Sequence, residues 1–199
     1  MSGKFIVFEG IDGSGKSTLV LNLAKLLWKE KKNDHILITR EPTSGFYGQE
    51  MRRLLKEKTD PAILGEKMLE LNFKDKVNHV NASIKPALEK SYYVLCDRYM
   101  YSSFVYQGLQ GITDERLKET YKGLLRPDVW FLLDLSPEKS LARLSSEKDL
   151  FEKIDWLTNL RNKYLQLAEQ YNGVILNAEL PADKLAEECY QALNERGLV

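Results

Sequence analysis

Short runs of apolar residues alternate with longer amphipathic segments along the chain. Each run is apolar throughout instead of at every second position, which is typical of parallel strands buried on both faces. The pattern therefore predicts a three-layer α/β fold, a five-stranded parallel sheet with helices on both faces. The expected strands are 4–9, 35–39, 92–96, 129–135 and 173–177.

The amphipathic segments between these runs have the spacing of helices. In 16–31, four leucines recur so that they share one helix face. Asp60 and Ser136 are each followed by proline, and a capping residue followed by proline is a common start of a helix. The expected helices are 16–31, 47–58, 61–80, 113–125, 137–145, 154–171 and a last one that begins at Pro181.

Composition and charge narrow the class of protein. With 199 residues, we expect one domain over 1–199. The 29 basic and 29 acidic side chains cancel, which excludes a globally basic nucleic-acid coat or a polyacidic tail. Two cysteines, Cys96 and Cys189, are too few for a disulfide framework or a zinc site and fit a reducing compartment. No secretory leader and no apolar stretch of about 18 residues is found, so we expect a cytoplasmic protein that binds neither nucleic acid nor membrane.

The segment after the first expected strand has the G-x-x-x-x-G-K-[ST] pattern of a phosphate-binding loop, with a helix after it. Its glycines allow backbone N–H groups to converge on a phosphate, and the helix N-terminus adds partial positive charge. Lys16 would place a full charge on the β- and γ-phosphates, and the Ser17 hydroxyl would bind Mg²⁺. We therefore expect a P-loop NTPase fold that binds a nucleoside triphosphate. The expected nucleotide-binding residues are Gly10, Gly13, Ser14, Gly15, Lys16, Ser17 and Thr18.

The loop alone does not say what is done with the nucleotide. A GTPase should carry the guanine-reading N-K-x-D, but the nearest string, at 162–165, ends in leucine inside an expected helix. A large motor ATPase needs a longer chain than this one. A small kinase that phosphorylates a small molecule remains.

Polar residues directly follow two of the expected strands. Asp97 and Arg98 come after the third strand, at the sheet edge where the carboxyl ends of parallel strands line the ligand crevice. There, Asp97 would act on Mg²⁺ or its waters, and Arg98 would contact transferring phosphate oxygens through its planar fork of donors. An ordinary surface ion pair is the alternative for these two residues. Glu41, after the second strand, would contact substrate, with pairing to Arg40 as its alternative.

The run DRYMYSSFVYQG at 97–108 closely resembles the D-R-Y-x-x-S-S-x-x-Y-Q-G signature of the thymidylate kinase family. The resemblance covers the chain from about Lys4 to the last expected helix. It implies transfer of a phosphoryl group from MgATP to dTMP, giving dTDP and ADP, by a homodimer. The other segments similar to that family are FEGIDG at 8–13, TREP at 39–42, GQEMR at 48–52 and RPD at 126–128.

The resemblance also implies roles for side chains at matching positions. Asp12 would hydrogen-bond the 3′-hydroxyl of the acceptor sugar, and Arg52 would hold the acceptor phosphate together with Arg98. Arg143 matches the arginine that lies near the adenine. The expected catalytic residues are Asp12, Lys16, Asp97, Arg98 and Arg143.

Base and sugar recognition would come from the second half of the signature. The resemblance implies that Ser103 and Gln107 read the thymine edge, and their spacing of four residues places them on one face of a helix. Ser102 stands beside Ser103 in the signature and belongs to the same expected acceptor site. Tyr106 would press against C2′ of the sugar and disfavour a ribose.

One departure from the family pattern bears on the base. Members carry F-x-x-x-R on the helix after T-R-E-P, but the best alignment places Asn72 at the phenylalanine and Lys76 at the arginine. Phe73, the next residue, points about 100° away on an ideal helix. Either the helix shifts to bring Phe73 to the base, or base recognition is looser. A nucleoside monophosphate kinase of different or broader base specificity is the alternative that these residues raise.

A second departure concerns the lid, which we expect at about 145–153. It is short, has no arginine and is similar to the brief lids of archaeal-type members. The transition-state charge would then be met by Lys16, Arg98, Arg143 and Mg²⁺, with Lys148 or Lys153 of the lid as a further candidate. A solvated surface charge is the alternative for Lys148. The missing arginines raise another alternative, a module that binds ATP without transferring its phosphate.

Overall fold

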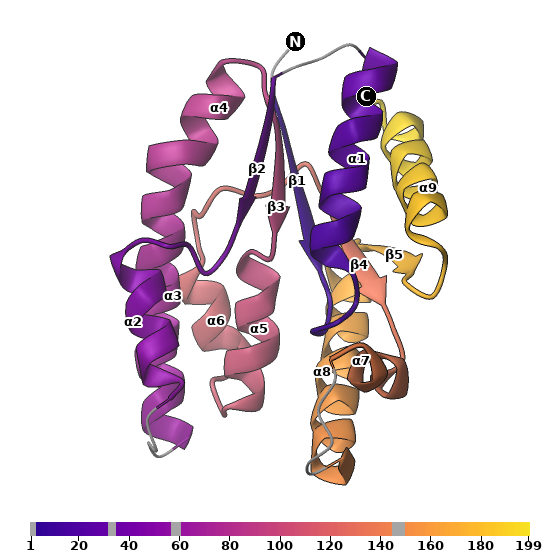
Figure 1. Cartoon of the computed structure of the whole chain (residues 1–199). Helices are drawn as coiled ribbons and strands as arrows, with labels where there is room; N and C mark the ends of the chain where they lie inside the picture. Colours follow the sequence, from indigo (N-terminus) through magenta and orange to yellow (C-terminus); the bar gives the residue numbers. More distant parts are fainter. Residues whose placement is uncertain (1–2, 32–34, 57–60, 145–149) are drawn as a thin grey trace.

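A parallel sheet runs through the computed structural model, which describes residues 3–31, 35–56, 61–144 and 150–199. The order across the sheet is β2-β3-β1-β4-β5, with β1 in the centre (Figure 1). The predicted α/β fold is confirmed, and each strand agrees with its expected run to within one residue at either end. The strands are β1 (Lys4–Glu9), β2 (Ile36–Arg40), β3 (Tyr93–Asp97), β4 (Val129–Asp134) and β5 (Val174–Asn177).

Helices make the connections between these strands. A π-helical turn, η1 (Val80–Ile84), continues the third helix into the fourth without a break in the chain direction. The helices are α1 (Lys16–Lys31), α2 (Phe46–Leu54), α3 (Pro61–His79), α4 (Lys85–Glu89), α5 (Met100–Leu109), α6 (Asp114–Thr120), α7 (Pro137–Leu144), α8 (Leu150–Gln170) and α9 (Ala182–Glu195). None of the described helices is long and apolar enough to cross a membrane.

The path of the chain across the sheet assigns the helices to two faces. From the central β1 the chain moves through α1 to the edge strand β2, and the later connections run in the opposite direction, toward β5. Because parallel crossovers are right-handed, this reversal places the later helices on the other face. One face is therefore covered by α1, with α9 packed beside it, and the other by α4, α5 and α8 (Figure 1).

The burial of β1, at the centre of the sheet, agrees with a sheet that helices cover on both faces. Five consecutive residues of β1, from Phe5 to Glu9, are buried, although successive strand side chains point to opposite faces. Helix α5 is also largely enclosed, with six of its ten residues buried. It therefore has no solvent-exposed polar face to give its sequence a helical period, and apolar spacing alone does not set its bounds.

Some expected boundaries are wrong. The helix expected at 113–125 ends at Thr120, because Tyr121 turns its side chain into the core and Gly123 adopts a left-handed φ of 79°. Of the expected lid, 145–149 with Lys148 lie outside the described residues, and 150–153 form the start of α8.

The strand register gathers the functional segments at one sheet edge. Phe8 of β1 pairs with Asp97 of β3, and Arg40 of β2 pairs with the same Asp97. The loops that follow these three strands therefore start side by side, at the carboxyl ends where open α/β sheets bind their ligands.

Candidate active site

The phosphate-binding loop begins where β1 ends, and its backbone requires glycine there. Gly10 has a φ of +143°, a conformation that residues with a Cβ rarely adopt. A Cβ on this residue would also lie 2.7 Å from the carbonyl oxygen of Leu133 in β4. The close approach of β4 and the loop thus depends on Gly10, which supports its place in the predicted motif.

Lys16 lies at the N-terminus of α1 and is only 7% exposed. Its Nζ donates to the carbonyl oxygens of Gly10 at 3.0 Å and Ile11 at 2.9 Å, and to Ser14 Oγ at 3.3 Å. Burial and then the charge of Arg98 lower the pKa of Lys16 to about 7, against the pull of nearby carboxylates. An anion between Lys16 and Arg98 would raise this pKa again, because it would favour the charged amine.

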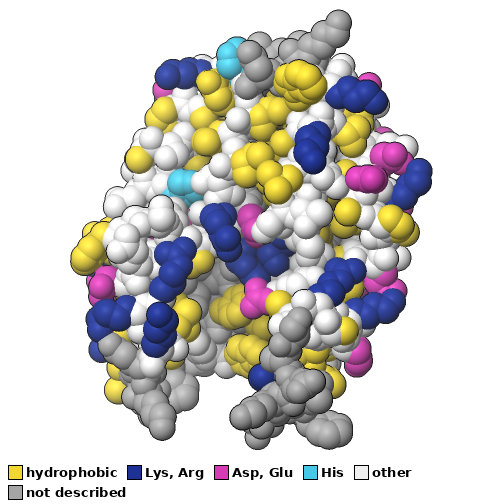
Figure 2. Space-filling model, in the orientation of Figure 1, with side chains coloured by type: hydrophobic (Ala, Val, Ile, Leu, Met, Phe, Trp, Pro, Cys, Tyr) yellow, Lys and Arg dark blue, Asp and Glu magenta, His cyan; other side chains and the backbone are white. Residues whose placement is uncertain are grey.

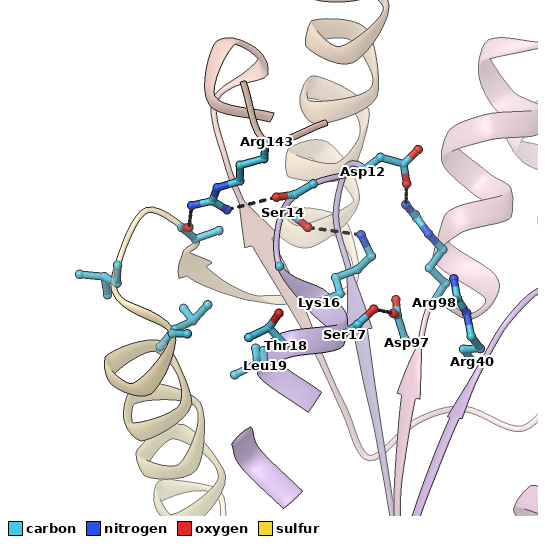
Figure 3. Close-up of a pocket in the computed structure, with 16 residues that line it drawn as sticks. Asp12, Ser14, Lys16, Ser17, Thr18, Leu19, Arg40, Asp97, Arg98 and Arg143 are labelled. Atoms are coloured by element: carbon cyan, nitrogen blue, oxygen red, sulfur yellow. Dashed lines mark hydrogen bonds and ion pairs between the residues drawn. The ribbon is translucent and has the colours of Figure 1, made fainter. Parts of the chain in front are cut away.

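Two side-chain oxygens lie near this lysine, those of Ser17 and Asp97. Ser17 Oγ donates to Asp97 Oδ2 at 2.7 Å, which joins the first turn of α1 to the end of β3 (Figure 3). Mg²⁺ prefers oxygen ligands, and in nucleotide sites it takes one or two from the protein and others from the phosphates. This pair fits that donor set, as the sequence predicts for both residues.

A cavity of about 490 Å³ opens along the loop and the first turn of α1. The residues expected to bind nucleotide all line it except Gly10, whose role is in the backbone of the loop. The guanidinium of Arg143 closes one side, donating to the carbonyl oxygens of Gly13 and Ala178 at 3.1 Å each (Figure 3). Arg40 also lines the cavity, which was not predicted from the sequence. The same holds for an apolar wall made of Ala178, Leu180, Ala182 and Leu185.

Arg98 stands at the edge of this cavity in a strained backbone conformation. Its φ of 68° is left-handed, which is unusual for a residue with a side chain and common at functional sites. Its Nη2 donates to Asp12 Oδ1 at 2.6 Å, and its Nη1 donates to Tyr164 Oη at 3.0 Å and Ser102 Oγ at 3.2 Å. The guanidinium is therefore held from three elements: the loop, α5 and α8.

The strained corner at Arg98 is supported by a buried carboxylate, Glu9. Its Oε1 accepts from the backbone N–H groups of Tyr99 at 2.9 Å and Ser102 at 3.0 Å. Its Oε2 accepts from Ser102 Oγ at 2.6 Å and Tyr164 Oη at 3.1 Å. Burial raises the pKa of Glu9, although Arg98 and these hydrogen bonds oppose that shift. The roles of Glu9 and Tyr164 were not predicted from the sequence. The signals for Glu9 were its place at the acidic end of an apolar strand and in the FEGIDG segment at 8–13.

A second cavity, of about 280 Å³, lies on the other side of Arg98. Met68 and Leu55 add an apolar part to its wall. The structure thus brings together most of the acceptor-site residues predicted from the sequence. Those that line it are Asp12, Glu41, Asn72, Lys76, Arg98, Ser102, Ser103, Tyr106 and Gln107.

Two predicted acceptor residues lie outside this cavity. Arg52 donates to the carbonyl oxygens of Pro42 and Thr43 at 2.7 Å each and lines a separate hollow of about 640 Å³. Phe73 packs edge-on against Tyr121, with 6.0 Å between the ring centroids. The helix therefore presents Asn72 to the acceptor cavity and does not shift to bring Phe73 there.

Glu41 is buried and pairs with two residues of α3. Lys76 Nζ lies 2.9 Å from Glu41 Oε2, and His79 Nδ1 lies 2.8 Å from Glu41 Oε1. On its other side, His79 Nε2 lies 2.7 Å from Thr39 Oγ1. Burial opposes the charge of Lys76, but Glu41 and other nearby acids outweigh it and raise the pKa of the amine. Glu41 thus both lines the acceptor cavity and anchors α3 to the end of β2.

Basic side chains gather at the centre of the molecular face that holds these cavities, near where the strands of Figure 1 end (Figure 2). A local positive field in a chain with no net charge fits a site for anionic ligands. The geometry can thus hold two phosphorylated ligands on either side of Arg98.

Comparison with known proteins agrees with this geometry. A model of the thymidylate kinase family matches residues 8–189. A probable thymidylate kinase of Methanocaldococcus jannaschii is 42% identical over 87% of this chain and 86% of its own. A probable thymidylate kinase of Pyrococcus abyssi is 37% identical over 94% of each chain. A thymidylate kinase of Caldicellulosiruptor saccharolyticus is 35% identical over 98% of each. The chain belongs to the thymidylate kinase family.

Proposed function

We propose that this protein is a thymidylate kinase, which transfers the γ-phosphoryl group of MgATP to the 5′-phosphate of dTMP and yields ADP and dTDP. The observation that carries this proposal is that the two cavities share Asp12 and Arg98. A nucleoside triphosphate on the phosphate-binding loop and a phosphorylated acceptor in the second cavity would meet at this pair. The sequence relationship supports the same activity.

On the donor side, the loop and α1 would bind the triphosphate. The backbone N–H groups of the loop and the Lys16 amine would neutralise its β- and γ-phosphates. Ser17 and Asp97, joined at 2.7 Å, are the residues that would hold Mg²⁺, which supplies charge neutralisation when it is bound. Arg143 and the apolar wall beside it would take the adenosine end.

The transfer itself needs no covalent intermediate on the protein. An oxygen of the acceptor phosphate forms a bond to the γ-phosphorus as the bond from that phosphorus to the β-bridging oxygen breaks, and ADP carries away the electron pair. Arg98, between the two cavities, would hold the oxygens of the phosphoryl group in line. Glu9, Ser102 and Tyr164 would keep its guanidinium in place.

The proposal includes a homodimer and a cytoplasmic location. The homodimer rests on the family resemblance, and sedimentation velocity of the purified chain tests it directly. The location rests on the two free cysteines, Cys96 and Cys189, which are both buried and carry raised pKa values because of that burial. Such thiols fit a reducing compartment.

Neither alternative raised by the sequence is favoured by the relatives, which carry thymidylate kinase names. A module that only binds ATP also needs no acceptor site, whereas this structure has a second cavity that shares Arg98 with the first. An acceptor of another base is tested by the same experiment that tests the main proposal.

The deciding measurement is ADP release from MgATP with dTMP, dUMP, dCMP, dGMP, UMP or AMP as the acceptor. We expect the highest kcat/KM with dTMP and loss of the signal in Lys16→Ala. If kcat/KM were highest with another acceptor, the kinase activity would stand and that nucleotide would be the substrate instead of dTMP. ATP binding without any acceptor-dependent release would overturn the kinase activity.

A further inference from the structure

Ser140 lies on α7, far along the chain from the phosphate-binding loop, and its side chain is fully buried. Its backbone N–H donates to the carbonyl oxygen of Ser136 at 3.0 Å within the helix. Its hydroxyl points out of the helix and donates to the carbonyl oxygen of Asp12 at 2.6 Å. Serine hydroxyls in helices often bond a carbonyl of their own helix instead. The contact therefore ties α7 to one particular peptide group of the loop.

This contact sets the direction of the next N–H group in the loop. The peptide between Asp12 and Gly13 is trans and planar, so its C=O and N–H bonds point in opposite directions. Because the Asp12 oxygen faces α7, the Gly13 N–H faces away from that helix. Gly13 lines the nucleotide cavity, and no described residue accepts a hydrogen bond from its N–H. The loop therefore presents this N–H as an open donor for a ligand of the cavity.

The following peptide, between Gly13 and Ser14, is held from both sides. Its carbonyl oxygen accepts from Arg143 Nη1, also on α7, at 3.1 Å (Figure 3). Its N–H donates to the carbonyl oxygen of Ile11 at 3.3 Å and closes a turn. Two side chains of α7 thus fix two consecutive carbonyl groups of the loop. Of the two N–H groups in these peptides, that of Gly13 is the one left for a ligand.

The close approach of α7 gives a physical reason for glycine at position 13. Gly13 has a left-handed φ of +74°, and a Cβ on it would lie 3.0 Å from the carbonyl oxygen of Ser140. The same Cβ would lie 3.3 Å from Leu144 Cγ. A side chain at this position would push α7 outward and lengthen the contact of the Ser140 hydroxyl. The loop and α7 therefore fit together as one unit.

We propose that Ser140 is a positioning residue for donor binding, which holds the peptide between Asp12 and Gly13 so that the Gly13 N–H is aimed at the phosphate chain of the nucleotide. The proposal deepens the function proposed above and rests on it, because the ligand is taken to be a nucleoside triphosphate. Ser140 does not line the cavity, so its hydroxyl acts through the peptide and not on the ligand. A backbone donor that is already aimed at an anion needs no reorientation when the anion binds.

Ser140→Ala tests the proposal, because it leaves the Asp12 carbonyl oxygen without this partner. The peptide can then rotate, and the Gly13 N–H loses its fixed direction. The readouts are the dissociation constants of magnesium tripolyphosphate, MgATP and dTMP, each measured alone by titration calorimetry. We expect the first two to rise by the same factor of about ten, the scale of one hydrogen bond to a charged group. The dissociation constant of dTMP should not change.

Ser136→Ala is the matched control. It removes a hydroxyl from the start of the same helix, at a residue that lies outside both cavities and accepts from the Lys139 N–H at 3.4 Å. It should change none of the three dissociation constants. Ser140→Cys keeps a weak donor and should raise the two phosphate dissociation constants less than Ser140→Ala does. If Ser140→Ala does not fold, the selective rise in Ser140→Cys decides the question.

Several outcomes would overturn the role of Ser140. One is an unchanged dissociation constant of tripolyphosphate in the folded Ser140 variants, and another is an equal rise in Ser136→Ala. An equal rise for dTMP would indicate a general loss of structure instead. A rise for MgATP alone would place the effect at the adenosine end, beside Arg143. The expected rise without ADP release for any acceptor would overturn the kinase function and leave the role of Ser140 intact.

Discussion

Asp12 Oδ1 lies 2.6 Å from Arg98 Nη2, and this ion pair stands between the nucleotide cavity and the acceptor cavity. Its two members come from the phosphate-binding loop and from the turn after β3. Asp12 is largely exposed while Arg98 is largely enclosed, so the arginine is the fixed member of the pair. An arriving phosphate would compete with Asp12 for the guanidinium and release that carboxylate for another partner.

Arg98→Ala should lower kcat by about a thousandfold or more, because an arginine aimed at a transferring phosphoryl group contributes on that scale. Arg98→Lys should recover little of this loss, since a lysine cannot reproduce the planar fork of donors. Steady-state ADP release measures both variants, with Arg116→Ala as an exposed arginine control. If Arg98→Ala raised the KM for dTMP and left kcat unchanged, the role of Arg98 would be to bind the acceptor and not to assist the transfer.

Tyr164→Phe should lower kcat by about tenfold without changing the KM for ATP, because the lost hydroxyl joins Glu9 to Arg98. The variant should also cost about 1 to 3 kcal/mol of unfolding free energy, since buried polar partners are left unsatisfied. Kinetics and urea denaturation measure the two effects. Tyr190→Phe, on α9 away from the site, should leave kcat unchanged. Loss of stability at normal kcat would reduce Tyr164 to a structural role.

The difference between residues found and missed at this site has a physical cause. Lys16, Ser17 and Asp97 could be found because their positions follow from one local motif and from the end of a strand. Tyr164 could not, since it reaches Arg98 from 66 residues farther along the chain and looks like any core tyrosine of an amphipathic helix. The sequence does not decide whether Asn72 or Phe73 faces the acceptor cavity, because the packing of Phe73 against Tyr121 decides it.

The protein should take up a proton when it binds ATP at pH 8, and this proton uptake should disappear near pH 6. The pKa of Lys16 is lowered to about 7 in the free chain, and an adjacent triphosphate would raise it. Above pH 7 the free amine is mostly neutral, so the affinity for ATP should fall by up to about tenfold per pH unit. Calorimetry in two buffers of different ionisation enthalpy measures the uptake. Lys16→Met should remove both effects, and a flat affinity from pH 6 to 9 in the wild type would contradict the lowered pKa.

Lys76→Met should destabilise the fold by about 3 to 5 kcal/mol, because it leaves Glu41 buried without its ammonium partner. His79, whose Nδ1 lies 2.8 Å from the same carboxylate, would remain as its other partner on α3.

Urea denaturation of the wild type and of Lys76→Met measures this loss of unfolding free energy. Lys74→Met is the matched control: Lys74 lies two residues earlier on the same helix and forms an exposed pair with Glu70, so its loss should leave the unfolding free energy nearly unchanged. Double substitution of Lys76 and Glu41 by methionine should cost less than Lys76→Met alone, because it removes the unpaired charge as well as the pair. An equal or larger cost in the double variant would show that Lys76 stabilises the fold by packing and not by neutralising Glu41.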